Sequence, residues 1–293
     1  MIELKEISYV RFGTPDLQMA ENFATNCLGL EVGDRSKKSL YLRSDDRAHT
    51  LCYTEGNPEE QTVGFEVDSE ENLQAAAATL EALGHPVHSG TPAECAARMV
   101  KAFIGFEDPT GNSIELVVRP ARSGRKFFPT RDIGITGFSH IGLYTTNPVR
   151  DEKFWTQVCN ARVSDRIGDI SLMRISAIHH TLAMAPGTKP GIQHVNHQVA
   201  SNDDVLRSFY FLSGRNVPIV FGPGRHPTSG ARFLYFTGPD GMTFEYSVGV
   251  DEIEDEETHR PRSFGFEPSS VCMWGSKRVG QGVPMPAAKQ WRD

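Results

Sequence analysis

Three short segments of this sequence carry metal-binding side chains inside strand-like patterns. His140 lies in GFSHIGL, His194 lies in IQHVNHQV, and Glu245 lies in DGMTFEY. Apolar and polar residues alternate in each segment, which is the pattern of a half-buried strand. Two imidazoles and one carboxylate from three strands can occupy one face of a metal ion and leave the opposite positions open, as suits non-heme Fe(II) centres that react with O2. The sequence therefore predicts a metal site at these three residues.

The first half of the chain repeats the strand pattern of the second half but lacks both imidazoles. The chain repeats itself at an offset of about 131 residues, which pairs Phe23 with Phe154 and the motif PTG with PDG. Repeats of this length are duplicated domains rather than solenoid units. At the positions that match the proposed ligands, the first copy has Tyr9, Thr62 and Glu115. We therefore expect the first copy to fold without a metal ion.

At the three proposed ligands the chain resembles the two-domain extradiol ring-cleaving dioxygenases of the vicinal oxygen chelate superfamily, over roughly residues 1–250. The resemblance implies Fe(II) as the metal, with Mn(II) as an alternative because both accept this ligand set. It also implies a catechol-type substrate, cleavage of its ring next to the vicinal hydroxyls with O2, and a homo-oligomer. The sequence does not identify the catechol.

Three further residues match positions that the family uses around its metal. The motif HHTLAM places His180 where the family has its proton-transfer histidine, and an imidazole that titrates near neutrality can accept and return a proton. GPGRHP resembles a family loop that brings a histidine, here His226, close to the substrate. In FLYFTGP, Tyr235 stands four residues before the proline, as the family's active-site tyrosine does. The resemblance therefore implies His180, Tyr235 and His226 as catalytic residues.

Other histidines near these motifs receive different interpretations. The resemblance favours His194 over His197 as a ligand, because His194 begins the HVxxxV strand that the family's second ligand begins. We expect His197, on the opposite face of the strand, to be structural. His179 also lies on the face opposite its neighbour and is left unassigned. The first copy contains His49 in the same HTL motif, so a structural reason for this motif in both copies stays open.

Helices are predicted where capping residues meet helical spacing. Thr14 is expected to begin the first helix and Gly29 to end it. In the second copy Asn147 takes the first role, and Asn160 replaces the glycine because asparagine also tolerates a left-handed backbone. Two further helices are expected over residues 69–83 and 202–213.

The resemblance implies an α+β fold with two tandem domains, each built from two βαβββ modules that form a partly open barrel. The expected divisions are a metal-free domain (1–120), a linker (121–134), a catalytic domain (135–250) and a C-terminal tail (251–293). The tail begins with an acidic run and contains Trp274 and Trp291 without clear periodicity. We expect it to pack on the barrel or on a neighbouring subunit.

Composition and charge favour a small-molecule enzyme. The 293 residues carry a formal charge of −7, with 39% hydrophobic and 23% charged residues, which argues against a surface for nucleic acid or anionic membranes. No apolar run long enough for a membrane span and no signal-peptide pattern is present, so we expect a cytoplasmic protein. The five scattered cysteines are expected to be buried and reduced.

Two other functions stay open at this point. Glyoxalase-like metal isomerases share the fold and do not need His226 and Tyr235 around the metal. Non-catalytic proteins of the same superfamily bind planar aromatic ligands, but these are single-repeat chains without the three proposed ligands. Oxygen consumption with catechols would separate an extradiol dioxygenase from both.

Overall fold

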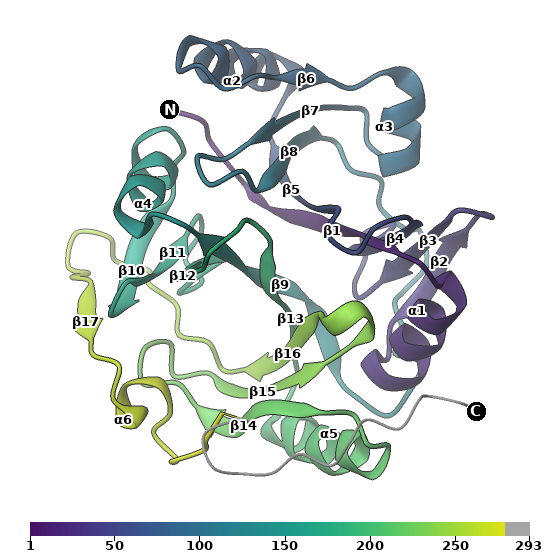
Figure 1. Cartoon of the computed structure of the whole chain (residues 1–293), viewed down its shortest axis with the longest axis vertical. Helices are drawn as coiled ribbons and strands as arrows, with labels where there is room; N and C mark the ends of the chain where they lie inside the picture. The colour runs from purple at the N-terminus through teal and green to yellow at the C-terminus, as the bar shows by residue number, and fades with distance from the viewer. Residues whose placement is uncertain (279–293) are drawn as a thin grey trace.

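The computed structural model describes residues 1–278, which form two twisted sheets with helices packed around them (Figure 1). The strands of the first sheet are β1 (Glu6–Thr14), β2 (Glu31–Arg35), β3 (Ser39–Arg43), β4 (Leu51–Glu55), β5 (Gln61–Val67), β6 (His88–Ser89), β7 (Ala102–Glu107) and β8 (Ser113–Val118). The strands of the second sheet are β9 (Ile135–Thr145), β10 (Arg162–Ile167), β11 (Ile170–Arg174), β12 (Leu182–Pro186), β13 (Ile192–Val199), β14 (Ile219–Arg225), β15 (Arg232–Thr237), β16 (Thr243–Val248) and β17 (Arg262–Phe264).

Each module contributes one long connection that contains a helix. The helices are α1 (Leu17–Phe23), which continues as the π-helical turn η1 (Ala24–Leu28), α2 (Glu70–Ala82), α3 (Pro92–Arg98), α4 (Pro148–Gln157), α5 (Asn202–Gly214), the 3-10 turn η2 (Pro239–Gly241) and α6 (Pro268–Val271). None of the helices within residues 1–278 is both long and apolar enough to cross a membrane.

The two sheets have the same internal order. The first runs β2-β3-β4-β1-β5-β8-β7-β6, and the second runs β10-β11-β12-β9-β13-β16-β15-β14 with β17 added beyond β10. Each sheet therefore joins two βαβββ modules through a central antiparallel pair, β1 with β5 and β9 with β13. This arrangement confirms the predicted α+β fold and its duplication. The boundaries given above for the domains and the linker stay predictions.

The predicted start of the first helix is wrong by two residues. Thr14 is the last residue of β1, and Asp16 caps α1 by accepting a hydrogen bond from Met19 N at 2.8 Å. The carboxylate reaches a free N–H of the first helical turn, which is the usual role of a capping residue. Gly29 ends the following turn at φ 79°, and Asn147 caps α4, both as predicted.

Asn160 does not have the predicted left-handed backbone. Residues 1–278 contain four non-glycine residues with positive φ, and Asn160 is not one of them. Its side-chain amide instead bonds both backbone groups of Leu4, at 3.0 Å each. The residue therefore ties the start of the chain to the second half rather than ending α4.

The two halves share one hydrophobic core. Phe65 of β5 packs against Trp155 of α4 with ring centroids 5.5 Å apart, and both belong to the same buried cluster. Polar contacts add to this interface: Tyr246 Oη donates to Leu28 O at 2.9 Å, and Arg47 Nη2 donates to Phe138 O at 3.1 Å. All five cysteines are free and buried, as predicted. The second sheet is therefore packed directly against the first.

The first part of the tail packs on the second sheet. β17 pairs with β10 in parallel, and α6 follows close to β14 (Figure 1). Cys272 is buried between Phe221 and Phe233, whereas Trp274 is exposed. Trp291, which the sequence analysis singled out, lies outside the described residues.

Candidate metal centre

Three neighbouring strands of the second sheet carry the proposed ligands. His140 lies in β9, the central strand, and His194 on β13 is the register partner of Gly142 on β9. Glu245 on β16 is the partner of Asn196 on β13. Because β13 lies between β9 and β16, all three side chains start from adjacent backbones. The sheet order therefore brings together residues that are 105 positions apart in sequence.

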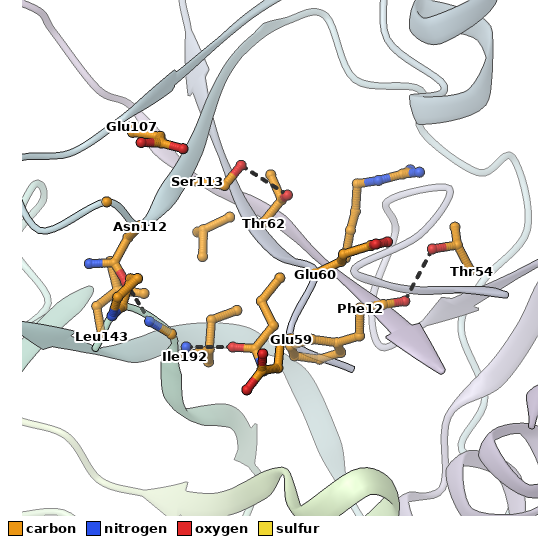
Figure 2. A pocket seen from close by; sticks show the side chains of 16 residues that line it. Phe12, Thr54, Glu59, Glu60, Thr62, Glu107, Asn112, Ser113, Leu143 and Ile192 are labelled. Carbon is orange, nitrogen blue, oxygen red and sulfur yellow. Dashed lines mark hydrogen bonds between the residues drawn. The ribbon is translucent and has the colours of Figure 1, made fainter. Parts of the chain in front are cut away.

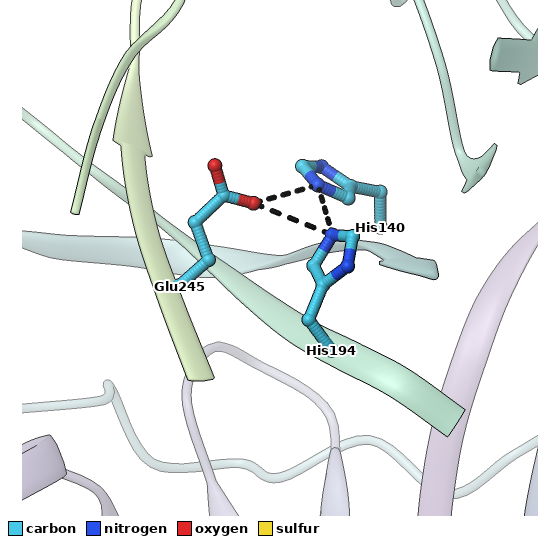
Figure 3. Close-up of side chains that lie close together, drawn as sticks. All are labelled: His140, His194 and Glu245. Atoms are coloured by element: carbon cyan, nitrogen blue, oxygen red, sulfur yellow. Dashed lines mark hydrogen bonds and ion pairs between the residues drawn. The ribbon is translucent and has the colours of Figure 1, made fainter. Parts of the chain in front are cut away.

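The three side chains converge on one point (Figure 3). His140 Nε2 lies 2.9 Å from Glu245 Oε2 and 3.1 Å from His194 Nε2, and His194 Nε2 lies 3.4 Å from the same carboxylate oxygen. All three residues are at least 95% buried. Their ligand atoms all lie within 4.8 Å of one another. The structure therefore brings the three proposed ligands together.

Glycine at position 142 makes room for the second imidazole. A Cβ atom built on Gly142 would lie 2.4 Å from His194 Nδ1, closer than non-bonded atoms approach. The matching pair in the first sheet is Arg11 with Thr62. The first sheet therefore lacks both the imidazole and the space for it.

The protonation states of the cluster suit a metal. Burial raises the pKa of Glu245, but the charge of His140 and its hydrogen bond with the carboxylate outweigh burial and hold that pKa well below its ordinary range. Burial lowers the pKa of His194 to about 3. An ionised carboxylate and a neutral imidazole are the forms that bind metal ions.

Hydrogen bonding selects the correct tautomer at His194. Gln193 Oε1 accepts a hydrogen bond from His194 Nδ1, so the lone pair of Nε2 faces the other two ligand atoms. Such outer partners orient metal-binding imidazoles in proteins. His140 Nδ1 has no partner among residues 1–278. The donor atoms, their charges and the His194 tautomer therefore fit a divalent cation held by His140, His194 and Glu245.

His180 lies beside this cluster. It precedes β12, and its ring centroid is 4.2 Å from that of His140. Burial lowers the pKa of His180 well below its ordinary value. The ring is therefore neutral and can accept a proton.

Tyr235 and His226 complete the surroundings. Tyr235 on β15 is the register partner of Glu245, and its ring lies 5.4 Å from the His194 ring. His226 Nε2 is 3.3 Å from Tyr235 Oη and 3.8 Å from Glu245 Oε1, while His226 Nδ1 donates to Val271 O at 2.9 Å. The structure thus brings all six predicted residues together, and the tail holds His226 in place.

A different interaction occupies the matched position in the first sheet. Glu115 accepts two hydrogen bonds from Arg98, at 2.8 and 2.6 Å, and one from Tyr9 Oη at 2.6 Å. The guanidinium of Arg98 supplies the positive charge beside this carboxylate, and Tyr9 stands where the second sheet has His140. This arrangement supports the expectation that the first copy holds no metal.

Two further buried histidines, His197 and His179, were not predicted to take part in the site. His197 packs against Phe138 away from the cluster, and neither ring nitrogen has a partner within residues 1–278, which agrees with a structural role. His179, left unassigned, is buried and bonds both His180 and Asp165. Comparison of the copies carried a signal for His179, because Ala48 stands at its matched position.

A cleft between the two halves is separate from the cluster. It has a volume of about 450 Å³, with residues such as Thr62, Ser113, Leu143 and Ile192 along it (Figure 2). None of the three proposed ligands lines it. The cleft belongs to the interface of the sheets rather than to the candidate site.

Comparisons with known proteins agree with the fold. An iron-dependent extradiol dioxygenase of Rhodococcus jostii is 27% identical, covering 94% of this chain and 97% of that protein. A 3-methylcatechol 2,3-dioxygenase of Pseudomonas putida is 28% identical, covering 86% and 92%. The crystal structure of a Mn(II)-bound glyoxalase from Novosphingobium aromaticivorans superimposes with a TM-score of 0.86 at 28% identity, covering 98% and 96%.

These relatives confirm the expected resemblance to extradiol dioxygenases. The family described as Glyoxalase/Bleomycin resistance protein/Dioxygenase superfamily matches residues 6–116 and again residues 137–246. Each match covers one of the two sheets. The chain therefore belongs to the Glyoxalase/Bleomycin resistance protein/Dioxygenase superfamily.

Proposed function

We propose that this chain is an extradiol dioxygenase that cleaves a catechol-type ring next to its vicinal hydroxyls with O2, in the breakdown of aromatic compounds. The observation that carries the proposal is the buried convergence of His140, His194 and Glu245 beside His180, Tyr235 and His226. The names of the Rhodococcus and Pseudomonas relatives support it.

The metal proposed for this site is Fe(II), held by His140, His194 and Glu245. Bound there, Fe(II) would supply a redox-active centre with ligand positions left over for a vicinal diol and for O2. Mn(II) is the alternative ion, since it accepts the same oxygen and nitrogen ligands. The Mn(II)-bound structural relative is consistent with that alternative.

His180 is proposed to move the protons of the reaction. A vicinal diol loses a proton when it binds as an anion, and a proton must return before the ring opens. The neutral ring of His180, adjacent to His140, can take the first proton and later give one back. Its buried position keeps bulk water away from this exchange.

Tyr235 and His226 are proposed to orient the substrate. Burial and the charge of Glu245 raise the pKa of Tyr235 well above its ordinary value, so the phenol keeps its proton and can donate to a diol oxygen. His226, tied to Val271 O through Nδ1, presents Nε2 toward Tyr235 and Glu245. The two side chains together fix the plane of a bound ring.

A glyoxalase-like isomerase is the second candidate. It is favoured by one observation, the TM-score of 0.86 and 28% identity with a Mn(II)-bound glyoxalase. An isomerase binds a metal but consumes no O2. A non-catalytic aromatic-binding protein has no comparable support. A cytoplasmic location and a homo-oligomer stay predictions.

The test is oxygen uptake by the Fe(II)-loaded chain. The full-length protein is reconstituted with Fe(II) without air and mixed with catechol, 3-methylcatechol or 2,3-dihydroxybiphenyl. We expect one O2 consumed per catechol and a yellow ring-opened product. No O2 uptake with any of these, despite a bound metal, contradicts the proposal and favours the isomerase.

A matched pair of variants controls this experiment. Glu245→Gln removes the ligand charge from the second sheet, whereas Glu115→Gln removes the equivalent charge from the first. We expect Glu245→Gln to lose activity and to weaken metal binding by at least about 100-fold. Glu115→Gln should keep both and lose stability instead, because Arg98 is left without its partner.

A further inference from the structure

Four side chains form a hydrogen-bonded chain that ends at the metal centre. Arg262 donates to Asp165 through Nε at 3.1 Å and through Nη2 at 2.6 Å, and its backbone N–H donates at 2.8 Å. Asp165 Oδ2 lies 3.0 Å from His179 Nε2, and His179 Nδ1 lies 3.1 Å from His180 Nδ1. Asp165 and His179 are almost completely buried, so water does not compete for these bonds.

The chemistry of the donors and acceptors fixes where the protons lie. Arg262 cannot accept a proton, and an ionised carboxylate only accepts hydrogen bonds, so His179 must donate to Asp165 from Nε2. Since the Nε2 proton of His179 is used in this bond, its Nδ1 is the nitrogen left to accept, and we assign the proton of the second bond to His180 Nδ1. His180 Nε2 is left with its lone pair and makes no hydrogen bond to any residue of the described chain.

The first copy shows what the same module looks like without this chain. His49 stands at the position of His180, but Ala48 replaces His179, and Asp34, at the position of Asp165, is exposed. His49 Nε2 has no partner within residues 1–278, and its ring stacks on Tyr9 at 5.1 Å. The HTL motif is therefore present in both copies, but in the described part of the chain only the second copy has a hydrogen-bond partner for its histidine, namely His179.

Both copies have a β-bulge at the aspartate. In the second copy the register between β10 and β11 shifts between Val163 and Asp165, and in the first it shifts between Val32 and Asp34. Bulges redirect side chains, and this one exists whether or not the carboxylate is used. The burial of Asp165 against His179 is thus specific to the copy that carries the metal ligands.

We propose that Asp165 and His179, anchored by Arg262, are positioning residues that hold His180 with its proton on Nδ1 and its Nε2 bare toward the substrate. This inference rests on the proposed function, because it specifies which nitrogen of His180 exchanges protons with the diol. It also assigns β17, which supplies Arg262, a role in the site.

The direct test is the tautomer of each ring. The full chain is labelled with 15N at histidine, and nitrogen–proton correlations are recorded for the metal-free form and for the form with diamagnetic Zn(II). Signals of residues 179 and 180 are assigned by their loss in His179→Ala and His180→Gln. We expect opposite tautomers in these neighbours, with the proton on Nε2 in His179 and on Nδ1 in His180.

Variants then separate positioning from folding. His179→Ala, which copies Ala48 of the first half, should leave His180 without a fixed Nδ1 proton and lower kcat about 10- to 100-fold at unchanged Fe(II) content and KM. His179→Gln, which keeps one donor and one acceptor, should recover part of the loss. Asp34→Asn is the control at the matched exposed position and should change neither readout.

The tautomer measurement tests the role of Asp165 and His179 separately from the test of catechol cleavage. A His180 proton on Nε2 in the unmodified chain, or a His180 spectrum that stays the same in both His179→Ala and Asp165→Asn, overturns it even if catechols are cleaved. The expected tautomers in a chain that consumes no O2 would instead refute the proposed function and leave the hydrogen-bonded chain in place.

Discussion

Gly142 controls how closely the second imidazole approaches the central strand. Its missing side chain leaves the space that His194 occupies, and the first copy fills the matched position with Arg11. A ligand set therefore needs more than the ligands themselves. It also needs a small neighbour on the adjacent strand, because packed interiors leave no spare volume for a displaced ring.

Gly142→Ala should therefore weaken metal binding while the fold remains. The new methyl group would lie 2.4 Å from His194 Nδ1, so the ring must leave the position in which its Nε2 lies 3.4 Å from Glu245 Oε2. We expect a loss of about 10- to 100-fold in metal affinity, measured by competition with a fluorescent chelator. Gly105→Ala on β7 is the control, because its nearest neighbour is 3.9 Å away. Equal affinities in the two variants would contradict this explanation.

The two HTL histidines give a second matched pair. His180→Gln should reduce kcat for catechol cleavage by about 10²- to 10⁴-fold, the usual contribution of a general acid–base. Metal content should stay unchanged because His180 is not a ligand. His49→Gln, at the same position of the first copy, should affect thermal stability only. A similar kinetic loss in both variants would mean that the motif acts through folding.

At the scale of elements, one carboxylate attaches the tail strand to the sheet. Asp165 on β10 accepts from the backbone and side chain of Arg262, the first residue of β17. Burial raises the pKa of Asp165, but hydrogen bonds with His179 and Arg262 outweigh it and lower the pKa below its ordinary value. The ionised carboxylate thus stabilises this edge of the sheet.

Acid should therefore loosen β17 before the rest of the sheet. A carboxylate with a lowered pKa stabilises the fold at pH values above the ordinary pKa of about 4 and loses this effect as the pH falls through its folded value. Amide exchange of residues 262–264, measured by mass spectrometry, should accelerate below about pH 4. Asp165→Asn should show fast exchange at neutral pH already. If exchange of these amides in the unmodified chain does not change with pH, Asp165 does not hold β17 in this way.

Alternation and capping residues predicted the strands around the three proposed ligands and the helices α1, α2, α4 and α5, and the errors at their ends have physical causes. The helices expected over residues 69–83 and 202–213 are observed as α2 (Glu70–Ala82) and α5 (Asn202–Gly214), because a serine cap and regular apolar spacing agree at each. Thr14 was wrongly predicted to cap the first helix because the same residue types occur at the end of a strand and at the start of a helix. Asn160 was misread because its partner, Leu4, lies 156 positions away.

The site also has a part that the sequence predicted and a part that it did not. Strand alternation and the family resemblance identified His140, His194 and Glu245, and comparison of the copies supported the two histidines because Tyr9 and Thr62 stand at their matched positions. The connection from Arg262 to Asp165 spans 97 residues and depends on which strand adds to the sheet edge, and sequence periodicity contains no information on this. His179 was left unassigned because the alternation placed it on the face opposite His180.

For the whole molecule, the duplication predicts one metal ion per chain. The second sheet offers a neutral imidazole beside an ionised carboxylate, whereas Arg98 already neutralises Glu115 in the first. Metal analysis of the reconstituted chain should give one ion. An ion at about 100 times its Kd should raise the free energy of unfolding by about 3 kcal/mol, and a chelator should reverse this shift in a thermal melt. Two ions per chain would contradict the assignment.

The ion pair between Arg98 and Glu115 also bears on how the two copies diverged. Restoring both imidazoles by Tyr9→His and Thr62→His would leave the guanidinium bound to the carboxylate and Arg11 beside the new ring. Removing Arg98 first would strand a buried carboxylate at a cost of about 3–5 kcal/mol. Both routes thus pass through an impaired intermediate, so the Arg98–Glu115 ion pair opposes stepwise conversion of the first sheet into a second metal centre.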